Sequence, residues 1–310
     1  MSNNAILKKR ITRKFLKQVM LERGYSVKKI ELANQFLENN MNLFKCPVCH
    51  SKFNKIGNHS LQCEQNHSFD LSKKGSLYFL LKGSKNEYDR EMLAARYAIA
   101  QAGLFNPLLE AIYGYIEHKK NGSLLDVGCG EGSQLDYLTQ LGLTGNNIGF
   151  DISKDAIQLA AGNFTSAFFC VADLAQSPFA TNEYDTLLNI FSPSNYEEFE
   201  RLLKKDGLII KVVPEKDYLI ELRKLFYHDQ KEKQSYSNQL VIDKFKEHFL
   251  EIETKRIRYS FSLTKQNFLD LMKMTPLGWG ASVEAKEYAL NHPLSKITID
   301  VCLLIGKNKA

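Results

Sequence analysis

The 310-residue sequence lacks any long hydrophobic run. No stretch approaches the roughly 18 consecutive apolar residues that a membrane-spanning helix needs. The first residues, MSNNAILKKRITRKF, are basic but contain no apolar core of about 7–15 residues, so they do not predict a secretory signal peptide. We therefore expect a cytoplasmic protein that has no membrane partner.

Cysteine and tryptophan are also scarce. The chain has six cysteines and one tryptophan, and three of the cysteines fall within residues 46–63. Because disulfides are rare in the cytosol, clustered cysteines there indicate metal binding or catalysis. Internal repeats and low-complexity tracts are missing, which excludes repeat architectures. At 44% hydrophobic residues, the chain can bury a large core.

Excess charge is confined to one end of the chain. Residues 1–41 contain nine of the 41 Lys and Arg residues but only three of the 35 Asp and Glu residues. The rest of the chain is left with 32 residues of each sign. Its bulk charge therefore gives no argument for nucleic-acid binding.

The polar stretch CPVCHSKFNKIGNHSLQCEQNH, residues 46–67, predicts a zinc site. Cys46-x2-Cys49 and Cys63-x3-His67 are two close pairs that can surround a tetrahedral ion, and four protein ligands make such a site structural. His50 or His59 could replace His67. A c-type haem string, Cys46-Pro-Val-Cys49-His50, is the competing interpretation, but it leaves Cys63 and His67 unexplained.

A glycine-rich turn follows a short apolar strand at residues 124–127 and precedes a predicted helix at 134–141. This is the opening β-turn-α unit of a doubly wound sheet. The turn contains Gly128, Gly130 and Gly132, but Ser133 occupies the position of the third glycine in a dinucleotide fingerprint. Glu131 in the turn disfavours a pyrophosphate and suits the ammonium and sulfonium groups of S-adenosylmethionine.

Acidic residues end the three strands that begin this sheet. Asp126 lies in the first strand, Asp151 ends the second and Asp173 ends the third. Asp151 is placed to accept both ribose hydroxyls, and Asp173 is suited to the adenine amino group. A nicotinamide dehydrogenase or a purely structural turn is the alternative interpretation.

The remaining apolar segments complete an α/β fold. Further strands are predicted at 184–191, 207–213, 251–263 and 296–307, with helical stretches between them. Seven strands are expected for a class I S-adenosylmethionine-dependent methyltransferase, a Rossmann-like sheet. We expect three parts: a basic extension (1–43), a small zinc ribbon (44–82) and a methyltransferase domain (83–310).

The order of these motifs resembles the bacterial 23S rRNA (guanine-N1-)methyltransferases over residues 44–305. The resemblance rests on Cys46-Pro-x-Cys49, Phe69-Asp70, Glu91-Met92, Ala95-Arg96, Ala102-Gly103, Pro107-Leu108, Leu125 to Gly132, Met274-Thr275-Pro276 and Trp279. It implies methylation of guanine N1 in a domain II hairpin near the peptide exit tunnel, with the zinc ribbon helping to hold the RNA. It also implies a homodimer.

The resemblance places Phe105, Gly130, Glu131 and Tyr218 on cofactor-contacting positions, although relatives can have tyrosine and histidine in place of Phe105 and Tyr218. The expected cofactor site is completed by the loop and strand-end residues Asp126, Gly128, Gly132, Asp151 and Asp173. Asn189 could position the acceptor base and Phe191 could stack on it, or Asn189 could simply cap its strand. The general base is not identified by the sequence.

Three other features allow two interpretations each. Trp279 is either a core residue or a base-stacking residue, and the lysines around the zinc ligands are either phosphate contacts or a solvated face. Residues 1–40 are either an RNA-binding arm or an accessory segment preceding a start at Met41, and we expect them to pack poorly on the body. The competing function is methylation of a small molecule or a protein, with the zinc merely bracing the fold.

Overall fold

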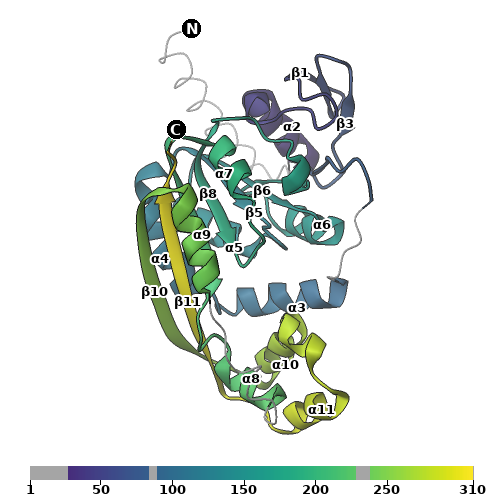
Figure 1. Ribbon diagram of the computed structural model, residues 1–310. Coiled ribbons are helices and arrows are strands. Elements are labelled where there is room, and N and C mark those ends of the chain that lie inside the picture. Colours follow the sequence, from purple (N-terminus) through teal and green to yellow (C-terminus); the bar gives the residue numbers. More distant parts are fainter. Residues whose placement is uncertain (1–26, 84–88, 228–237, 310) are drawn as a thin grey trace.

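The computed structural model describes residues 27–83, 89–227 and 238–309. A small antiparallel sheet near the amino terminus has the order β1-β2-β3, and its strands are β1 Phe53–Gly57, β2 Ser60–Cys63 and β3 Ser68–Asp70. Figure 1 shows this sheet beside helix α2, above one end of the large sheet.

The large sheet has eight strands in the order β10-β11-β9-β8-β5-β6-β7-β4. Their bounds are β4 Leu77–Tyr78, β5 Ser123–Val127, β6 Asn146–Asp151, β7 Phe168–Val171, β8 Tyr184–Ile190, β9 Leu203–Pro214, β10 Leu250–Ser262 and β11 Lys296–Lys307. The seven predicted strands are confirmed. The eighth, β4, comes from the end of the zinc ribbon and pairs in parallel with β7.

Helices connect the strands and cover both faces of the sheet. The α-helices are α2 Lys29–Asn40, α3 Arg90–Gln101, α4 Asn106–Ile116, α5 Ser133–Leu141, α6 Lys154–Asn163, α7 Tyr196–Leu202, α8 Ile220–Phe226, α9 Gln239–His248, α10 Lys265–Met274 and α11 Val283–Asn291. The 3-10 helices are η1 Met41–Leu43, η2 Glu117–Lys119, η3 Leu174–Gln176 and η5 Pro276–Gly280.

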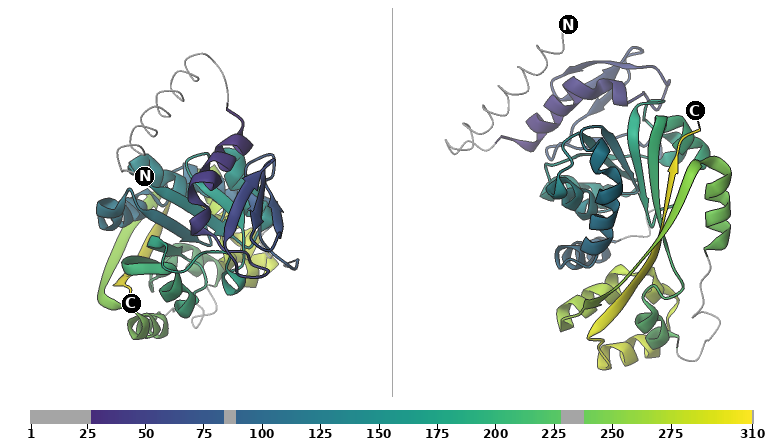
Figure 2. Two further views of the ribbon diagram at one scale, coloured as in Figure 1. Left: turned by 90° about the horizontal axis from the view of Figure 1, so that it is seen from above. Right: turned by 90° about the vertical axis from the view of Figure 1, so that its left-hand side faces the viewer.

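Two hydrophobic cores lie on opposite faces of the sheet. Successive buried residues of β9 alternate between them: Ile210 packs with α4, α5 and α6, whereas Ile209 packs with α7, α9 and the zinc ribbon. This alternation follows the two-residue period of a strand. The last strands extend further, since β11 pairs with β10 over residues 296–300, beyond its pairing with β9. Figure 2 shows α8, α10 and α11 around this extension, at the end remote from the zinc ribbon.

Helix α2 corrects one expectation. The segment before the zinc ligands was expected to pack poorly, but Leu37 of α2 is fully buried and the Phe36 ring stacks on Phe168 of β7 at 5.0 Å between centroids. Lys29 Nζ donates to the carbonyls of Ala161 and Gly162 at the end of α6, where a cation meets the negative end of the helix dipole. This packing was not expected from the sequence, because the partner of α2 is a distant strand that local pattern does not reveal.

The proposed RNA-binding role of the basic residues before α2 falls on residues 1–26, which lie outside the described residues. Among the helices of the described ranges, none is both long and apolar enough to cross a membrane.

Candidate functional site

Four metal-ligating side chains converge at one end of the small sheet, and they are Cys46, Cys49, Cys63 and His67. The sulfur atoms of Cys49 and Cys63 are 3.7 Å apart, and His67 Nδ1 lies 3.5 Å from the Cys63 sulfur and 3.7 Å from the Cys46 sulfur. With Zn–S bonds of about 2.3 Å, a tetrahedral zinc ion separates its sulfur ligands by about 3.8 Å. The spacing fits a structural zinc ion, and His59 instead contacts Glu31.

The zinc ribbon shares its core with the large sheet. Phe53 and Phe69 of the ribbon pack on Phe79, which follows β4, and Phe79 packs on Phe44. Phe44 in turn contacts the rings of Phe168 and Phe179 beneath the large sheet. The ribbon is therefore joined to the methyltransferase domain by a continuous aromatic core.

The three glycines of the loop after β5 all have left-handed backbone conformations. Their φ values are +76° at Gly128, +57° at Gly130 and +84° at Gly132. A Cβ atom on Gly128 would lie 2.1 Å from Ser192 Oγ, so the turn after β8 closes directly over the start of the loop. Glycine is required here by conformation and by space.

Two of the three acidic residues predicted from the strand ends, Asp126 and Asp151, lie at this loop together with Glu131. Asp126 and Glu131 are each 1% exposed, and Asp151 accepts the Gly130 N–H at 3.0 Å and the Ser153 N–H at 2.8 Å. Burial raises the pKa of Asp126 to about 7 and also raises the pKa of Asp151. Asp173 is partly exposed two residues beyond β7 and caps η3 by accepting the Ala175 N–H at 2.9 Å.

Arg96 of α3 supplies the cation that these carboxylates require. Its Nε lies 2.9 Å from Glu131 Oε2, and its guanidinium is in van der Waals reach of the Cβ position of Gly130. The neighbouring positive charge opposes the upward shift in the pKa of Asp126. The sequence marks Arg96 only as part of the family pattern, because Arg96 and Glu131 are 35 residues apart and no local pattern links them.

Three aromatic rings line up beside the loop. The Phe191 ring lies 6.2 Å from Phe105 and 5.3 Å from Tyr218 between centroids, so residues from three separate connections meet. Phe191 has φ +55°, a left-handed backbone conformation that costs energy for a bulky residue. Such strained residues are found preferentially at functional sites. Burial raises the pKa of Tyr218 to about 12, so its hydroxyl stays protonated.

Asn189 is fully buried and uses its amide within its own turn. Its Nδ2 donates to the Pro193 carbonyl at 3.0 Å, and its Oδ1 accepts from Ser194 at 3.2 Å and from Lys211 Nζ at 2.6 Å. These contacts favour the interpretation that Asn189 fixes the end of β8. Lys211, which the sequence analysis did not single out, also donates to the Ser192 carbonyl at 3.2 Å.

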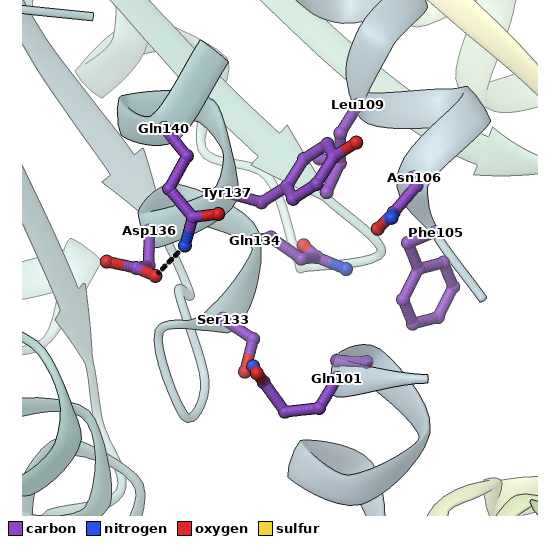
Figure 3. Close-up of a pocket in the computed structure, with 10 residues that line it drawn as sticks. Gln101, Phe105, Asn106, Leu109, Ser133, Gln134, Asp136, Tyr137 and Gln140 are labelled. Carbon is purple, nitrogen blue, oxygen red and sulfur yellow. Dashed lines mark hydrogen bonds between the residues drawn. The ribbon is translucent and has the colours of Figure 1, made fainter. Parts of the chain in front are cut away.

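A pocket of about 160 Å³ lies behind the loop, between the end of α3 and the starts of α4 and α5. Phe105 forms part of its wall, and Figure 3 shows Gln134 extending from α5 toward Asn106. Ser133 Oγ and Gln134 Nε2 are buried and have no hydrogen-bond partner among the described residues. Two donors left unsatisfied in a pocket are suited to an anionic or carbonyl oxygen. No motif marked these residues in the sequence.

The structure also bears on Trp279 and on the lysines around the zinc ligands. Trp279 in η5 is 51% exposed, so the core interpretation is wrong for this residue. Lys74 Nζ donates to the Gln158 carbonyl at 3.1 Å and thus helps to hold α6 against the zinc ribbon. Lys85, another of the lysines considered for phosphate contact, lies outside the described residues.

Comparisons with known proteins agree with this geometry. A family model described as a methyltransferase domain matches residues 118–272, and the model of the amino-terminal zinc ribbon of RlmA matches residues 44–82. The Bacillus subtilis protein YxjB, whose name assigns it to the 23S rRNA (guanine-N1-)methyltransferases, is 42% identical over 85% of this chain and 96% of its own. The 23S rRNA (guanine(748)-N1)-methyltransferase of Streptomyces fradiae is 27% identical over 78% of this chain and 88% of its own.

The fold and the site define a class I S-adenosylmethionine-dependent methyltransferase with an amino-terminal zinc ribbon. Within that class, the chain belongs to the family of 23S rRNA (guanine-N1-)methyltransferases. Its cofactors are accordingly S-adenosylmethionine and a structural zinc ion.

Proposed function

We propose that the enzyme methylates N1 of a guanine in the domain II hairpin of 23S rRNA, near the peptide exit tunnel. One observation carries this proposal: buried carboxylates lie at the glycine loop of a sheet that also contains a strand of the zinc ribbon. That strand is β4, at the edge of the sheet. The methyl-donor site and the RNA-binding module are thereby parts of one packed unit. The family resemblance supports the choice of hairpin.

The cofactor, when bound, supplies an electrophilic methyl group on a sulfonium. We place its ribose hydroxyls at Asp151, its adenine amino group at Asp173 and its ammonium group between Asp126 and Glu131. Its carboxylate faces Ser133 and Gln134, whose donors lack partners among the described residues. Gly128, Gly130 and Gly132 let the backbone approach, and Phe105 and Tyr218 flank the site.

The acceptor atom imposes its own requirements. Guanine N1 carries a proton at neutral pH and lies on the base-pairing edge, so the base must leave its pair and lose that proton. The turn after β8 lies against the first loop glycine, and the Phe191 ring lies 5.3 Å from Tyr218. These contacts support a role for Phe191 in stacking on the flipped base. Asn189 acts here as a positioning residue, because it fixes this turn.

The zinc ribbon offers several lysines for RNA phosphates. Those in the described residues that do not bond to α6 are Lys45, Lys52, Lys55, Lys73 and Lys82. A homodimer would present two such ribbons to the RNA. Because the proposed substrate is ribosomal RNA, we place the enzyme in the cytoplasm.

Reconstitution with purified enzyme tests the proposal against methylation of a small molecule or protein. A transcript of the domain II hairpin is incubated with radiolabelled S-adenosylmethionine, and the product nucleoside is identified by mass spectrometry. We expect 1-methylguanosine at one position of the loop. A matched transcript in which that guanine is replaced by adenine should remain unlabelled. Labelling of cell extract proteins or metabolites, with none of the hairpin or of whole 23S rRNA, would contradict the proposal.

A further inference from the structure

Lys211 is a cation buried in the sheet without a carboxylate partner. It is 5% exposed in β9, and its Nζ donates to two neutral oxygens, Oδ1 of Asn189 and the Ser192 carbonyl. Within the described residues it forms no salt bridge. Burial lowers the pKa of Lys211 to about 8. Lysine is almost never buried unless it is paired, so this placement costs stability and calls for a functional reason.

Lys211 lies at the end of the sheet that carries the glycine loop, because the Ser192 turn that it holds lies against Gly128. It lies opposite Asn189 in the pairing of β8 with β9, near the carboxyl ends of these strands. The turn that it holds touches the Cβ position of Gly128 and carries Phe191, whose ring lies between Phe105 and Tyr218. An ammonium group has three N–H donors, and two of them are used by the turn.

The proposed methyl transfer creates a charge that this third donor can meet. The electron pair of the N1–H bond forms the new N1–C bond, the C–S pair returns to sulfur, and the N1 proton passes to solvent. As the proton leaves, negative charge spreads from N1 to the exocyclic O6 of guanine. A fixed donor in a dry site stabilises such developing charge more than water does.

We propose that Lys211 is a catalytic residue whose free N–H donates to guanine O6 and stabilises the charge that develops there during methyl transfer. This inference rests on the proposed function, and it assigns to the chain a substrate contact that no family motif in the sequence marks. It also explains why the lysine is held by neutral oxygens. A carboxylate partner would cancel the charge that the reaction uses.

Single-turnover kinetics on the rRNA hairpin tests this role. Lys211→Met removes the donor and keeps the aliphatic length, and Lys211→Arg keeps a cation. Lys205→Met removes an exposed lysine from the same strand as a matched control. We expect Lys211→Met to slow methylation about 100-fold, the loss typical of one such donor, with the Kd for S-adenosylmethionine unchanged within about twofold. Lys211→Arg should recover part of the rate, and Lys205→Met should match the wild type.

Replacing O6 of the target guanine by sulfur separates catalysis from support of the turn. Sulfur is a weak acceptor, so the substitution should slow the wild type much more than Lys211→Met. Equal slowing of both proteins would overturn the proposal, as would a Lys211→Met rate within threefold of the wild type. If Lys211→Met does not fold, Lys211→Arg is compared with the wild type on both RNAs. A wild type that never methylates guanine N1 refutes the proposed function instead.

Discussion

At the residue scale, the glycine loop carries a cluster of carboxylates beside the guanidinium of Arg96. Asp126, Glu131 and Asp151 surround the glycines, and Arg96 pairs with Glu131 from α3. Glu131 is therefore already paired in the free protein. On the proposed placement of the cofactor's ammonium, binding of the cofactor shares or replaces that ion pair.

Asp151→Ala should weaken the binding of S-adenosylmethionine about 10- to 150-fold for each ribose hydrogen bond that it removes. Each charged hydrogen bond to a ribose hydroxyl contributes about 1.5–3 kcal/mol, and the variant also releases the Gly130 N–H. Calorimetry gives the Kd directly. Asp155→Ala, at an exposed carboxylate that pairs with Arg90, is the control. Wild-type affinity in Asp151→Ala would remove Asp151 from the site.

Cofactor affinity should rise between pH 5.5 and pH 7 because Asp126 ionises in that range. The pKa of Asp126 is raised to about 7, so its carboxyl is neutral in the folded protein below that pH. The stability that the neutral carboxyl contributes is lost as the pH rises through 7. The cofactor's ammonium instead favours the carboxylate. Titration calorimetry of the wild type and Asp126→Asn at several pH values isolates this effect. Parallel pH profiles for the two proteins would show that another group is responsible.

At the element scale, α2 and β4 join the zinc ribbon to the large sheet. Helix α2 stacks Phe36 on β7, and β4 adds to the same edge through Leu77 and Tyr78. Removal of residues 1–26 spares these contacts, whereas removal of residues 1–40 deletes α2 and exposes Phe168. The two truncations should therefore differ.

We expect the protein lacking residues 1–40 to be clearly less stable than the protein lacking residues 1–26, because only the longer truncation deletes α2. Leu37→Ala should cost about 2–5 kcal/mol of unfolding free energy, since Leu37 is fully buried. Gln35→Ala, on the exposed face of α2, is the control. Denaturant unfolding measures both. Equal stability of Leu37→Ala and Gln35→Ala would mean that α2 does not pack as described.

Removal of zinc should loosen the ribbon and its connection to the sheet. Because Phe53 and Phe69 share a core with Phe79 and Phe44, the disturbance should reach β4 and α2 as well as the ligand turns. Hydrogen exchange on chelator-treated protein should therefore rise in residues 44–83 and 29–40 and stay low in β5 and β8. Cofactor affinity should persist while hairpin methylation falls. Unaltered exchange after complete removal of zinc would contradict a structural role.

At the scale of the whole molecule, the sequence predicted those features that depend on the spacing of nearby residues. The zinc ligands, the glycine loop, the acidic strand ends and the seven strands all follow from spacing and periodicity. The pairing of β4 with β7, the packing of α2 and the contact between Arg96 and Glu131 join segments that are far apart in sequence. Lys211 was missed because a single lysine in an apolar strand carries no motif. Its partners become visible only when β8 and β9 are paired.

Mapping the modification in cells tests whether this chain methylates guanine N1 in 23S rRNA. 23S rRNA from a strain lacking the gene is compared by mass spectrometry with rRNA from the same strain carrying the wild-type gene or the Asp151→Ala form. We predict that one 1-methylguanosine in the domain II hairpin is absent from the deletion strain, restored by the wild type and reduced with Asp151→Ala. Identical 23S rRNA methylation in all three strains would contradict the account.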